Sequence, residues 1–326
     1  MKDSYKVLLV DDDPNNLKVL QQILKEHFQL IFAINGEKAL QAAKEHSPDI
    51  ILLDIMMPDM DGFQVCWRLK ADPATAGIPV IFVTAMGELE DEARGFDAGA
   101  VDYIQKPVSG PIVLRRVQTH LSLVKADELD NLARAAIKML GDAGHYNDPY
   151  TGEHIWRMAD YSAAIARAAG WKTSQVEMIE LAAPTHDTGK IGIPHGILKA
   201  ARRLDAEEWA IMKTHSQIGY DILSKTDNPV FKMAAEIARY HHEKWDGSGY
   251  PMGLSGENIP EAARIVAIAD VFDALTTKRP YKEPWPLEET LKVMKEISGS
   301  HFEPRLLAIF LDIMPEILRI KAIWGQ

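Results

Sequence analysis

The sequence lacks the features that mark secreted and membrane proteins. Cys66 is the only cysteine among its 326 residues, so a disulfide framework and a thiolate metal site are both excluded. No apolar stretch approaches the roughly 18 residues that a membrane helix needs. The polar start of the chain, residues 1–5, leads directly into a short apolar run rather than a signal peptide. We therefore expect a cytoplasmic protein with no insertion into the membrane.

An excess of positive charge is also absent. Lysine and arginine number 36 against 47 aspartate and glutamate residues, which gives a net charge of −11. Such an acidic chain disfavours general binding to nucleic acids, and we expect no DNA partner. A ligand that carries phosphate would need a local group of cations or metal ions. The length predicts about two domains, and the sequence shows neither internal repeats nor low-complexity segments.

The first part of the chain alternates short apolar runs with amphipathic segments. Strand, helix and strand at this spacing predict a doubly wound α/β fold, in which helices cover both faces of a five-stranded parallel sheet. The expected strands are residues 7–10, 30–33, 50–53, 80–83 and 101–104. We assign residues 1–125 to this first domain.

Polar side chains follow four of the five apolar runs. Asp11 and Asp12 come after the first run, Asp54 after the third, Thr84 after the fourth and Lys106 after the fifth. Because the carboxyl ends of parallel strands lie along one edge of a sheet, we expect these side chains to converge there. A group of carboxylates favours a hard cation such as Mg²⁺, which holds like charges together.

Five short strings accompany these residues: Val10-Asp-Asp, Leu53-Asp54-Ile-Met-Met-Pro58, Asp61-Gly62, Thr84-Ala85 and Lys106-Pro107. In these strings the first 125 residues resemble the receiver domain of a two-component response regulator. The resemblance implies that Asp54 accepts a phosphoryl group from a cognate sensor histidine kinase. It also implies a Mg²⁺ ion held by Asp12, Asp54 and the Met56 carbonyl, with Asp11 acting nearby or through water.

The same resemblance implies roles for three further receiver residues. Thr84 and Lys106 would bind the oxygens of the new phosphoryl group. Tyr103 is similar to the aromatic switch residue that changes rotamer in such domains.

The stretch from Ile112 to Leu140 contains neither glycine nor proline, which predicts one long helix. Its apolar side chains form a stripe that could contact a partner helix in a homodimer or the chain's own next domain. We expect residues 126–141 to be a linker helix that continues the last receiver helix. The stripe runs in two groups with a slip of one residue between them: Leu114, Val117, Leu121 and Val124, then Leu129, Leu132, Ala136 and Met139.

From residue 142 onward the pattern is helical, and we assign residues 142–326 to an all-α domain. The adjacent His186 and Asp187 are costly in a core, because an imidazole and a carboxylate must both leave water. A cation explains the pair, since histidine offers a neutral ring nitrogen and aspartate an oxygen that can bridge two ions. Alone, the pair could be a solvated helix end. Other residues favour the metal: His154, His215, His241, His242, His301, and Asp270 in an apolar surround.

A series of spaced strings runs through this second half: Thr151-Gly-Glu-His154, His186-Asp-Thr-Gly-Lys-Ile-Gly-Ile-Pro194, His215, His241-His-Glu-Lys-Trp-Asp-Gly-Ser-Gly-Tyr-Pro251, Ile268-Ala-Asp-Val-Phe-Asp-Ala274, Arg279-Pro-Tyr-Lys282 and His301-Phe-Glu-Pro304. They closely resemble the HD-GYP phosphodiesterases, a branch of the HD hydrolase superfamily, over about residues 145–310. The resemblance implies a metal-dependent phosphodiesterase that acts on the bacterial second messenger cyclic di-GMP.

The resemblance also implies a ligand set for two divalent ions. His154, His186, Asp187 and Asp270 would bind one ion, and Asp187 would bridge to a second ion completed by His215, His241 and His242. Nitrogen and carboxylate ligands suit Fe, Mn, Zn, Ni or Co without choosing among them. Two such ions would generate a bridging hydroxide and stabilise an in-line displacement at phosphorus. Lys190 would neutralise charge at the scissile phosphate.

Substrate contacts are implied at three further positions. Tyr250, in a glycine-rich loop, would face the substrate together with Arg279 and Lys282, which suit phosphate. The product would be linear pGpG, or GMP after a second cleavage. Two alternatives remain: a hydrolase that prefers pGpG, and a module that senses nucleotide or docks a diguanylate cyclase.

Some relatives use a glutamate for a third ion where Tyr150 stands here, so we expect two ions. His301 is expected to be structural.

Overall fold

The N-terminal part of the chain forms the expected parallel sheet. The computed structural model describes residues 5–85, 97–145, 153–200, 202–277 and 283–324. The chain divides into two compact units, and the boundary along the sequence falls between Leu129 and Asp130. The sheet order is β2-β1-β3-β4-β5, with every pairing parallel. The predicted fold class is thus confirmed, and each strand lies within one residue of its expected position. The strands are β1 (Lys6–Val10), β2 (Gln29–Ala33), β3 (Ile50–Asp54), β4 (Val80–Thr84) and β5 (Asp102–Gln105).

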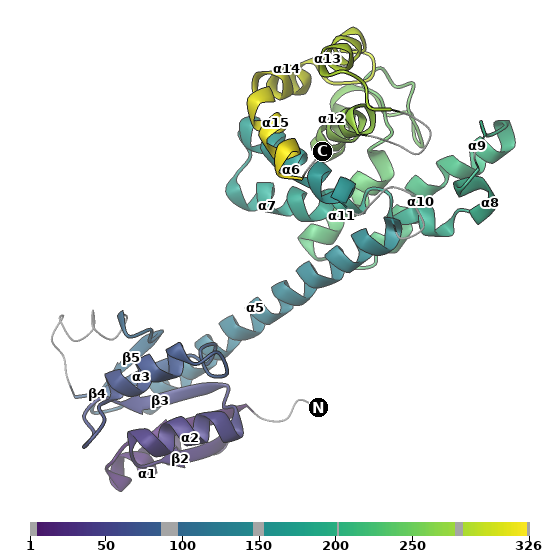
Figure 1. The fold of residues 1–326 in the computed structure, drawn as a ribbon. Coiled ribbons are helices and arrows are strands. Elements are labelled where there is room, and N and C mark those ends of the chain that lie inside the picture. Colours follow the sequence, from purple (N-terminus) through teal and green to yellow (C-terminus); the bar gives the residue numbers. More distant parts are fainter. Residues whose placement is uncertain (1–4, 86–96, 146–152, 201, 278–282, 325–326) are drawn as a thin grey trace. The chain divides into compact units, whose positions relative to one another are not determined.

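Helices cover both faces of this sheet, as Figure 1 shows. On one face, α1 (Pro14–Leu24) and the start of α5 (Gly110–His145) pack on the sheet through residues such as Leu20 and Val117. On the other face, α2 (Gly36–His46) and α3 (Gly62–Ala71) pack through residues such as Ala39 and Val65. Both layers of side chains are buried, which explains why the strands read as continuous apolar runs.

The carboxyl edge of the sheet is built by capping residues and a close backbone contact. Asp13 accepts a hydrogen bond from the Asn15 amide and caps α1, and Asp61 caps α3 in the same way through the Gln64 amide. Such caps stabilise a helix by about 1 kcal/mol each. Gly62 follows directly, and a Cβ there would lie 2.3 Å from the Asp54 carbonyl oxygen. A glycine is therefore needed to bring α3 against the strand end that carries Asp54.

The long helix α5 confirms the prediction made from the stretch without glycine or proline, and it extends to 36 residues. Val117 and Leu121, from the first half of the predicted stripe, are buried in the receiver core. Leu129, Leu132 and Met139, from the second half, are 57–63% exposed. The helical unit buries Ile137 instead. The part of α5 predicted as a linker therefore divides between the two compact units.

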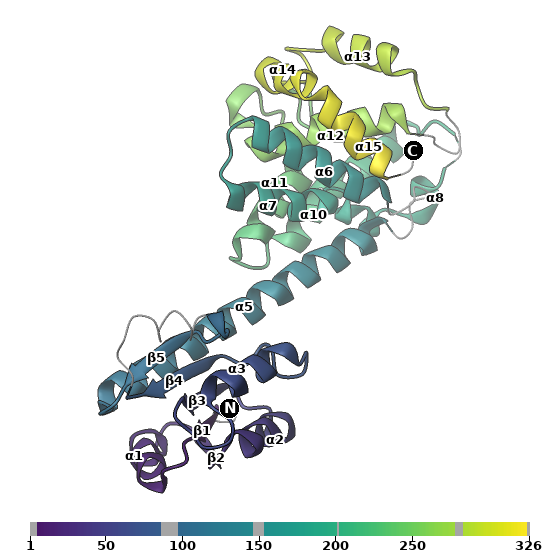
Figure 2. The same ribbon diagram turned by 60° about the vertical axis from the view of Figure 1, so that its left-hand side comes forward.

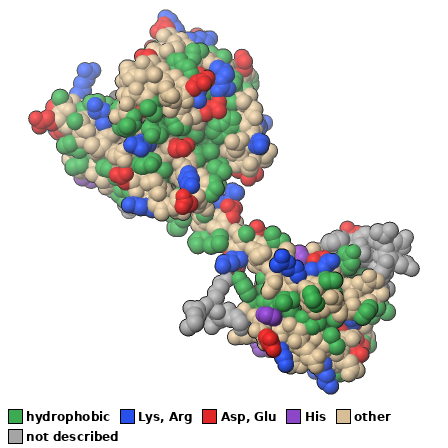
Figure 3. Space-filling model, turned by 180° about the vertical axis from the view of Figure 1, so that it is seen from behind, with side chains coloured by type: hydrophobic (Ala, Val, Ile, Leu, Met, Phe, Trp, Pro, Cys, Tyr) green, Lys and Arg blue, Asp and Glu red, His purple; other side chains and the backbone are tan. Residues whose placement is uncertain are grey.

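The second unit is helical over its described residues, as expected. Its core lies between α6, α7, α11 and α12, and Figure 2 shows α15 packed on α6. On the face seen in Figure 3, charged side chains of both signs are interspersed with hydrophobic ones. The α-helices are α6 (Glu153–Ala168), α7 (Thr173–Ala182), α8 (His195–Leu198), α9 (Ala206–Lys213), α10 (His215–Leu223), α11 (Pro229–Tyr240), α12 (Glu261–Thr276), α13 (Leu287–Glu296), α14 (Pro304–Asp312) and α15 (Met314–Ile323).

Two features of this unit differ from the simplest interpretation of the sequence. Residues 207–223 read as a single helical run, but the structure divides them into α9 and α10 at Thr214. Between α7 and α8 the chain forms two short 3₁₀ turns, η1 (Ala183–Thr185) and η2 (Thr188–Gly192). The His186-Asp187 pair lies between these turns, and His215 is the first residue of α10.

Candidate metal centre and receiver acid cluster

A close backbone contact brings the His186-Asp187 turn against α10. A Cβ at Gly189 would lie 1.9 Å from the His215 carbonyl oxygen, so a side chain at this position would force the two segments apart. Gly189 therefore allows the close approach of these two segments. As a result, His215 faces the turn, and His186, Asp187 and His215 are all buried.

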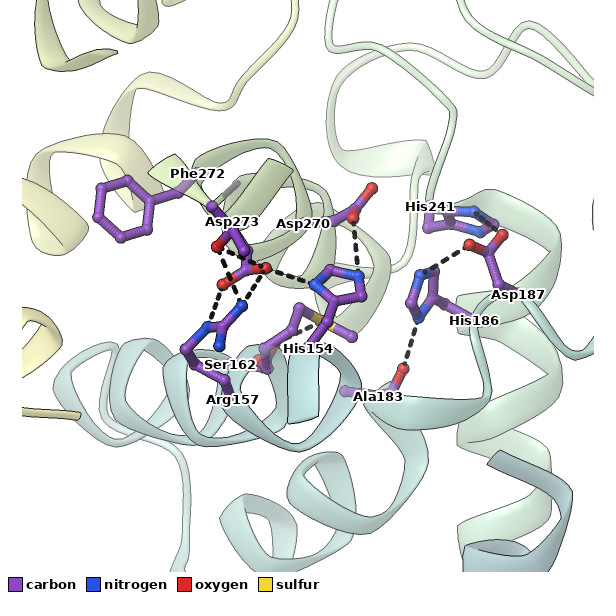
Figure 4. A network of polar contacts seen from close by, with 12 residues as sticks. His154, Arg157, Ser162, Ala183, His186, Asp187, His241, Asp270, Phe272 and Asp273 are labelled. Carbon is purple, nitrogen blue, oxygen red and sulfur yellow. Dashed lines mark hydrogen bonds and ion pairs between the residues drawn. The ribbon is translucent and has the colours of Figure 1, made fainter. Parts of the chain in front are cut away.

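The ligand atoms of seven predicted residues gather into two neighbouring groups in the helical unit. Within each group the atoms lie within 4.8 Å of one another. The ligands come from α6, the turn between η1 and η2, the start of α10, the end of α11 and α12. Figure 4 shows His154, His186, Asp187, His241 and Asp270 facing a common region. The first group is His154, His186 and Asp270, and the second is Asp187, His215, His241 and His242.

Asp187 belongs to the second group and also contacts His186 of the first. Its Oδ2 is 3.2 Å from His186 Nε2 and 2.6 Å from Lys190 Nζ. Its Oδ1 is 3.4 Å from His215 Nε2 and 3.8 Å from His241 Nε2. Burial opposes ionisation of this carboxyl, but the Lys190 ammonium and the adjacent imidazoles outweigh it and hold its pKa well below the usual range. An ionised carboxylate therefore presents one oxygen to each group.

Main-chain carbonyls orient three of the histidines. His186 Nδ1 donates to the Ala183 carbonyl at 3.0 Å, and His215 Nδ1 donates to that of Met212 at 2.8 Å. His241 Nδ1 donates to the Ile237 carbonyl at 3.1 Å. A proton on Nδ1 leaves the Nε2 lone pair for a ligand bond, which is the tautomer that metal-binding histidines adopt. This donor set fits divalent metal ions.

Burial keeps most of these imidazoles neutral. It lowers the pKa of His241 well below the ordinary value and that of His242 to about 3, with neighbouring imidazoles adding to the effect. The pKa of His215 is lowered by burial as well. Burial also acts to lower the pKa of His186, but the Asp187 carboxylate reverses the shift and raises it. A cation beside Asp187 would compete with that proton.

The orientation of His154 depends on a residue that the sequence reasoning left without a role. Its Nδ1 contacts the Asp273 carboxylate, which also accepts bonds from Arg157 Nε at 2.5 Å and Nη2 at 2.9 Å. Both Arg157 and Asp273 are buried, and Figure 4 shows them on the side of His154 that faces away from His186. The signal was present in the spacing, because each residue lies three positions from a predicted ligand, His154 or Asp270.

The glycine-rich loop brings Tyr250 to the second group. The Tyr250 ring lies 4.7 Å from the His242 ring, centroid to centroid, at an interplanar angle of 30°. Glu243 holds the end of the loop by accepting from the amides of Met252 at 2.7 Å and Leu254 at 3.1 Å. The loop conformation therefore follows from a buried carboxylate that immediately succeeds a predicted ligand.

The remaining predicted residues of the helical unit lie outside the two ligand groups. Lys190 contacts Asp187, as given above, whereas Arg279, Lys282 and Tyr150 lie outside the described residues. His301 is not in either group, and its ring stacks on Phe302 with centroids 4.6 Å apart.

The receiver residues also converge at the carboxyl edge of the sheet. Asp11, Asp12 and Asp54 place carboxylate oxygens within 4.8 Å of one another. Lys106 Nζ lies 2.8 Å from Asp11 Oδ2 and 3.1 Å from Asp54 Oδ2. Burial raises the pKa of Asp54 despite the opposing effect of Lys106. A divalent cation would relieve the repulsion among these three acids.

The remaining receiver predictions lie around this cluster. Thr84 is buried at the end of β4, next to the cluster in the strand order, and Met56 is exposed in the loop after β3. Tyr103 is partly buried on β5, with the Arg116 guanidinium 5.6 Å from its ring centroid. Arg116 also donates to the Tyr103 carbonyl at 2.7 Å, which ties β5 to α5.

The fold and the two sites together define a receiver domain joined to an HD-type helical metal domain. The family described as "Response regulator receiver domain" matches residues 7–118, and "HD domain" matches residues 127–306. The chain belongs to the response regulators that carry an HD phosphodiesterase domain. Membership of the HD family implies divalent metal binding. None of the described helices is long and apolar enough to cross a membrane.

Curated relatives share much of the sequence. A "Probable cyclic di-GMP phosphodiesterase" of Vibrio cholerae is 38% identical over 94% of this chain and 77% of its own length. The "Cyclic di-GMP phosphodiesterase response regulator RpfG" of Xanthomonas campestris is 35% identical over 94% of this chain and 86% of its own. A "3'3'-cGAMP-specific phosphodiesterase 2" of Vibrio cholerae is 43% identical over 60% of this chain and 37% of its own.

Proposed function

We propose that this protein hydrolyses cyclic di-GMP to linear pGpG at a binuclear metal site, under the control of phosphorylation at Asp54. The observation that carries the proposal is the position of Asp187, whose two oxygens face different groups of potential ligands. A carboxylate in this position suits a bridge between two ions. The names of the relatives supply the substrate class.

Each ion would have four protein ligands. His154, His186 and Asp270 would bind the first ion together with Asp187, and the second group, including Asp187, would bind the other. Imidazole and carboxylate ligands suit Fe, Mn, Zn, Ni or Co. A bound pair of such ions supplies an activated water and stabilises charge on the oxygens of a phosphodiester undergoing displacement.

The chain's own residues would bind and orient the substrate. Lys190, which is partly exposed beside Asp187, would place an ammonium near the scissile phosphate. Tyr250 would lie beside the bound substrate, because its ring contacts His242 of the second ligand group. Arg279 and Lys282 would hold phosphate, with Arg279 able to donate two parallel bonds. A second cleavage of pGpG to GMP would use the same site.

One assay separates the candidate activities. The metal-loaded protein would be incubated with cyclic di-GMP, pGpG and 3'3'-cGAMP, and the products would be resolved by chromatography. The cGAMP arm is included because a relative specific for that dinucleotide is 43% identical in the matched region. Preference for cyclic di-GMP supports the proposal, whereas preference for pGpG favours the alternative hydrolase. Tight binding without turnover would favour a nucleotide-sensing module, which could dock a diguanylate cyclase.

Control would begin at the receiver acid cluster. Mg²⁺ held by Asp11, Asp12, Asp54 and the Met56 carbonyl would assist transfer of a phosphoryl group from a sensor histidine kinase to Asp54. Lys106 already contacts Asp54 and, with Thr84, would bind the phosphoryl oxygens, so that Tyr103 changes rotamer. A kinase partner and a nucleotide messenger both imply action in the cytoplasm.

The exposed stripe on α5 supports a homodimer. Leu129, Leu132 and Met139 lie at helical spacing and are more than half exposed. A second copy of the helix would cover them. Sedimentation of the wild-type protein against a variant with Leu129 and Leu132 both replaced by glutamate would test this interface.

A further inference from the structure

A half-exposed tryptophan lies next to the candidate metal centre without a role in the proposal above. Trp209, on α9, is 48% exposed. The helix that carries it is capped at its start, since Asp205 and Glu208 form a capping box there. Arg202 also makes two bonds of 2.6 Å to the Glu208 carboxylate. Trp209 is therefore an exposed aromatic ring on a well-capped helix.

The path from this ring to the ligands passes through one residue. The Trp209 and Tyr250 ring centroids are 6.5 Å apart at an interplanar angle of 78°. Tyr250 in turn lies against His242, a member of the second ligand group, with centroids 4.7 Å apart. Trp209 therefore contacts Tyr250, and Tyr250 in turn contacts the ligand group.

Tyr250 is already engaged by protein contacts. Besides His242 and Trp209, its ring lies 6.4 Å from the His215 ring, and the Lys213 ammonium is 5.8 Å from its centroid. The side chain is partly buried, and burial raises its pKa. Trp209 is the more exposed of the two rings. Lys213, about one helical turn after Trp209 on α9, brings a positive charge to this region in a chain of net charge −11.

We propose that Trp209 stacks against one purine base of the nucleotide substrate, with Lys213 beside it attracting the attached phosphate. Every base offers a π-face, and stacking on an aromatic side chain is a common source of nucleotide affinity. A dinucleotide with its scissile phosphate at the metal centre carries a base on either side of that phosphate. One base can therefore extend past Tyr250 toward α9. This inference rests on the proposed function and adds a residue that determines substrate affinity.

The test compares three variants by steady-state kinetics on whichever dinucleotide the wild type hydrolyses. Trp209→Leu removes the ring and should raise KM by about ten-fold or more, with kcat within about two-fold of wild type. Trp209→Phe retains a ring and should recover most of the affinity. Trp67→Leu is the matched control, because Trp67 is 66% exposed on α3 of the receiver, and its KM should not change. Metal content and melting temperature are measured for each variant.

A separate variant tests the cation. Lys213→Gln should raise KM and weaken its dependence on salt concentration, since a screened charge is removed.

Each outcome distinguishes this inference from the proposed function. A wild type that hydrolyses a dinucleotide while Trp209→Leu keeps an unchanged KM overturns the stacking role alone. The same holds if kcat falls at constant KM, or if Trp67→Leu raises KM equally. A wild type that neither binds nor cleaves any of the three dinucleotides overturns the proposed function, and the stacking role with it.

Discussion

Replacing Asp273 by asparagine should disturb the metal centre through His154. The Asp273 carboxylate contacts His154 Nδ1 and accepts two bonds from Arg157. Asparagine has nearly the same size, but one of its two terminal atoms is an NH₂ donor. That donor must face the imidazole N–H or the guanidinium, both of which need an acceptor. The His154 ring then loses its fixed tautomer and orientation.

The expected loss follows from the kind of contact that is broken. Removing the hydrogen-bond partner of a metal-binding histidine lowers metal affinity by about 10- to 100-fold, which corresponds to about 1.4–2.8 kcal/mol. Stability should fall as well, because Arg157 is a buried cation. Complete removal of a buried partner costs about 3–5 kcal/mol. The loss should be smaller here, since the asparagine oxygen can still accept one bond.

The measurement is a calorimetric titration of metal-free protein with Mn²⁺, accompanied by thermal unfolding. Asp160→Asn is the matched control, because Asp160 lies on α6 with His154 but accepts its bond from Trp324 Nε1 at 2.8 Å. Arg157→Met removes the other partner of Asp273 and leaves the histidine contact, so it should lower the melting temperature more than metal affinity. If folded Asp273→Asn protein binds two ions as tightly as the wild type, the positioning role is refuted.

Three further predictions address the bridge, the switch and the backbone contact. Asp187→Ala should abolish activity and reduce bound metal from about two ions to one or none, measured by elemental analysis; full metal content with turnover would remove the bridging assignment. Beryllofluoride, a phosphoryl mimic, should change kcat or dimer affinity by about five-fold or more in the wild type and have no effect on Asp54→Asn. Confirmed binding of the mimic without either change, in turnover and sedimentation, would count against the switch. Gly189→Ala should lower the free energy of unfolding by about 3 kcal/mol, because its Cβ would overlap the His215 carbonyl. Gly196→Ala, where no atom lies within 4 Å of the added Cβ, is the control in chemical denaturation, and equal stability of the two variants would contradict the argument.

The elements that the sequence predicted well are those with a strong local signal. The receiver strands are buried on both faces, so their apolar runs stand out from the amphipathic helices between them. The length of α5 follows from a stretch without helix breakers. The His186-Asp187 pair stood out because an imidazole and a carboxylate are costly in an apolar helical segment, whereas the full ligand set was implied by the resemblance to the HD-GYP phosphodiesterases. The strand and helix signals need only neighbouring residues, and no knowledge of the tertiary contacts.

The features that sequence reasoning missed depend on tertiary contacts. Asp273 and His154 are 119 positions apart, and helical spacing shows which face each occupies but not which partner it meets. The break at Thr214 interrupts a continuous helical pattern, and the His215 ring at the start of α10 lies beside Asp187, a contact that local periodicity does not reveal. The partner of the apolar stripe on α5 was likewise left open, since the periodicity of Leu129 and Leu132 does not indicate what packs against them.

The source of the hydrogen-bond acceptors gives the two ligand groups unequal tolerance to mutation. The acceptors for His215 and His241 are main-chain carbonyls, which every amino acid possesses. Substitutions at those acceptor positions can accumulate over evolution without removing the atom that orients the ring. The acceptor for His154 is a side-chain carboxylate, which a single nucleotide change can eliminate. During neutral drift, the group that contains His154 is therefore where metal binding would first be retuned or lost.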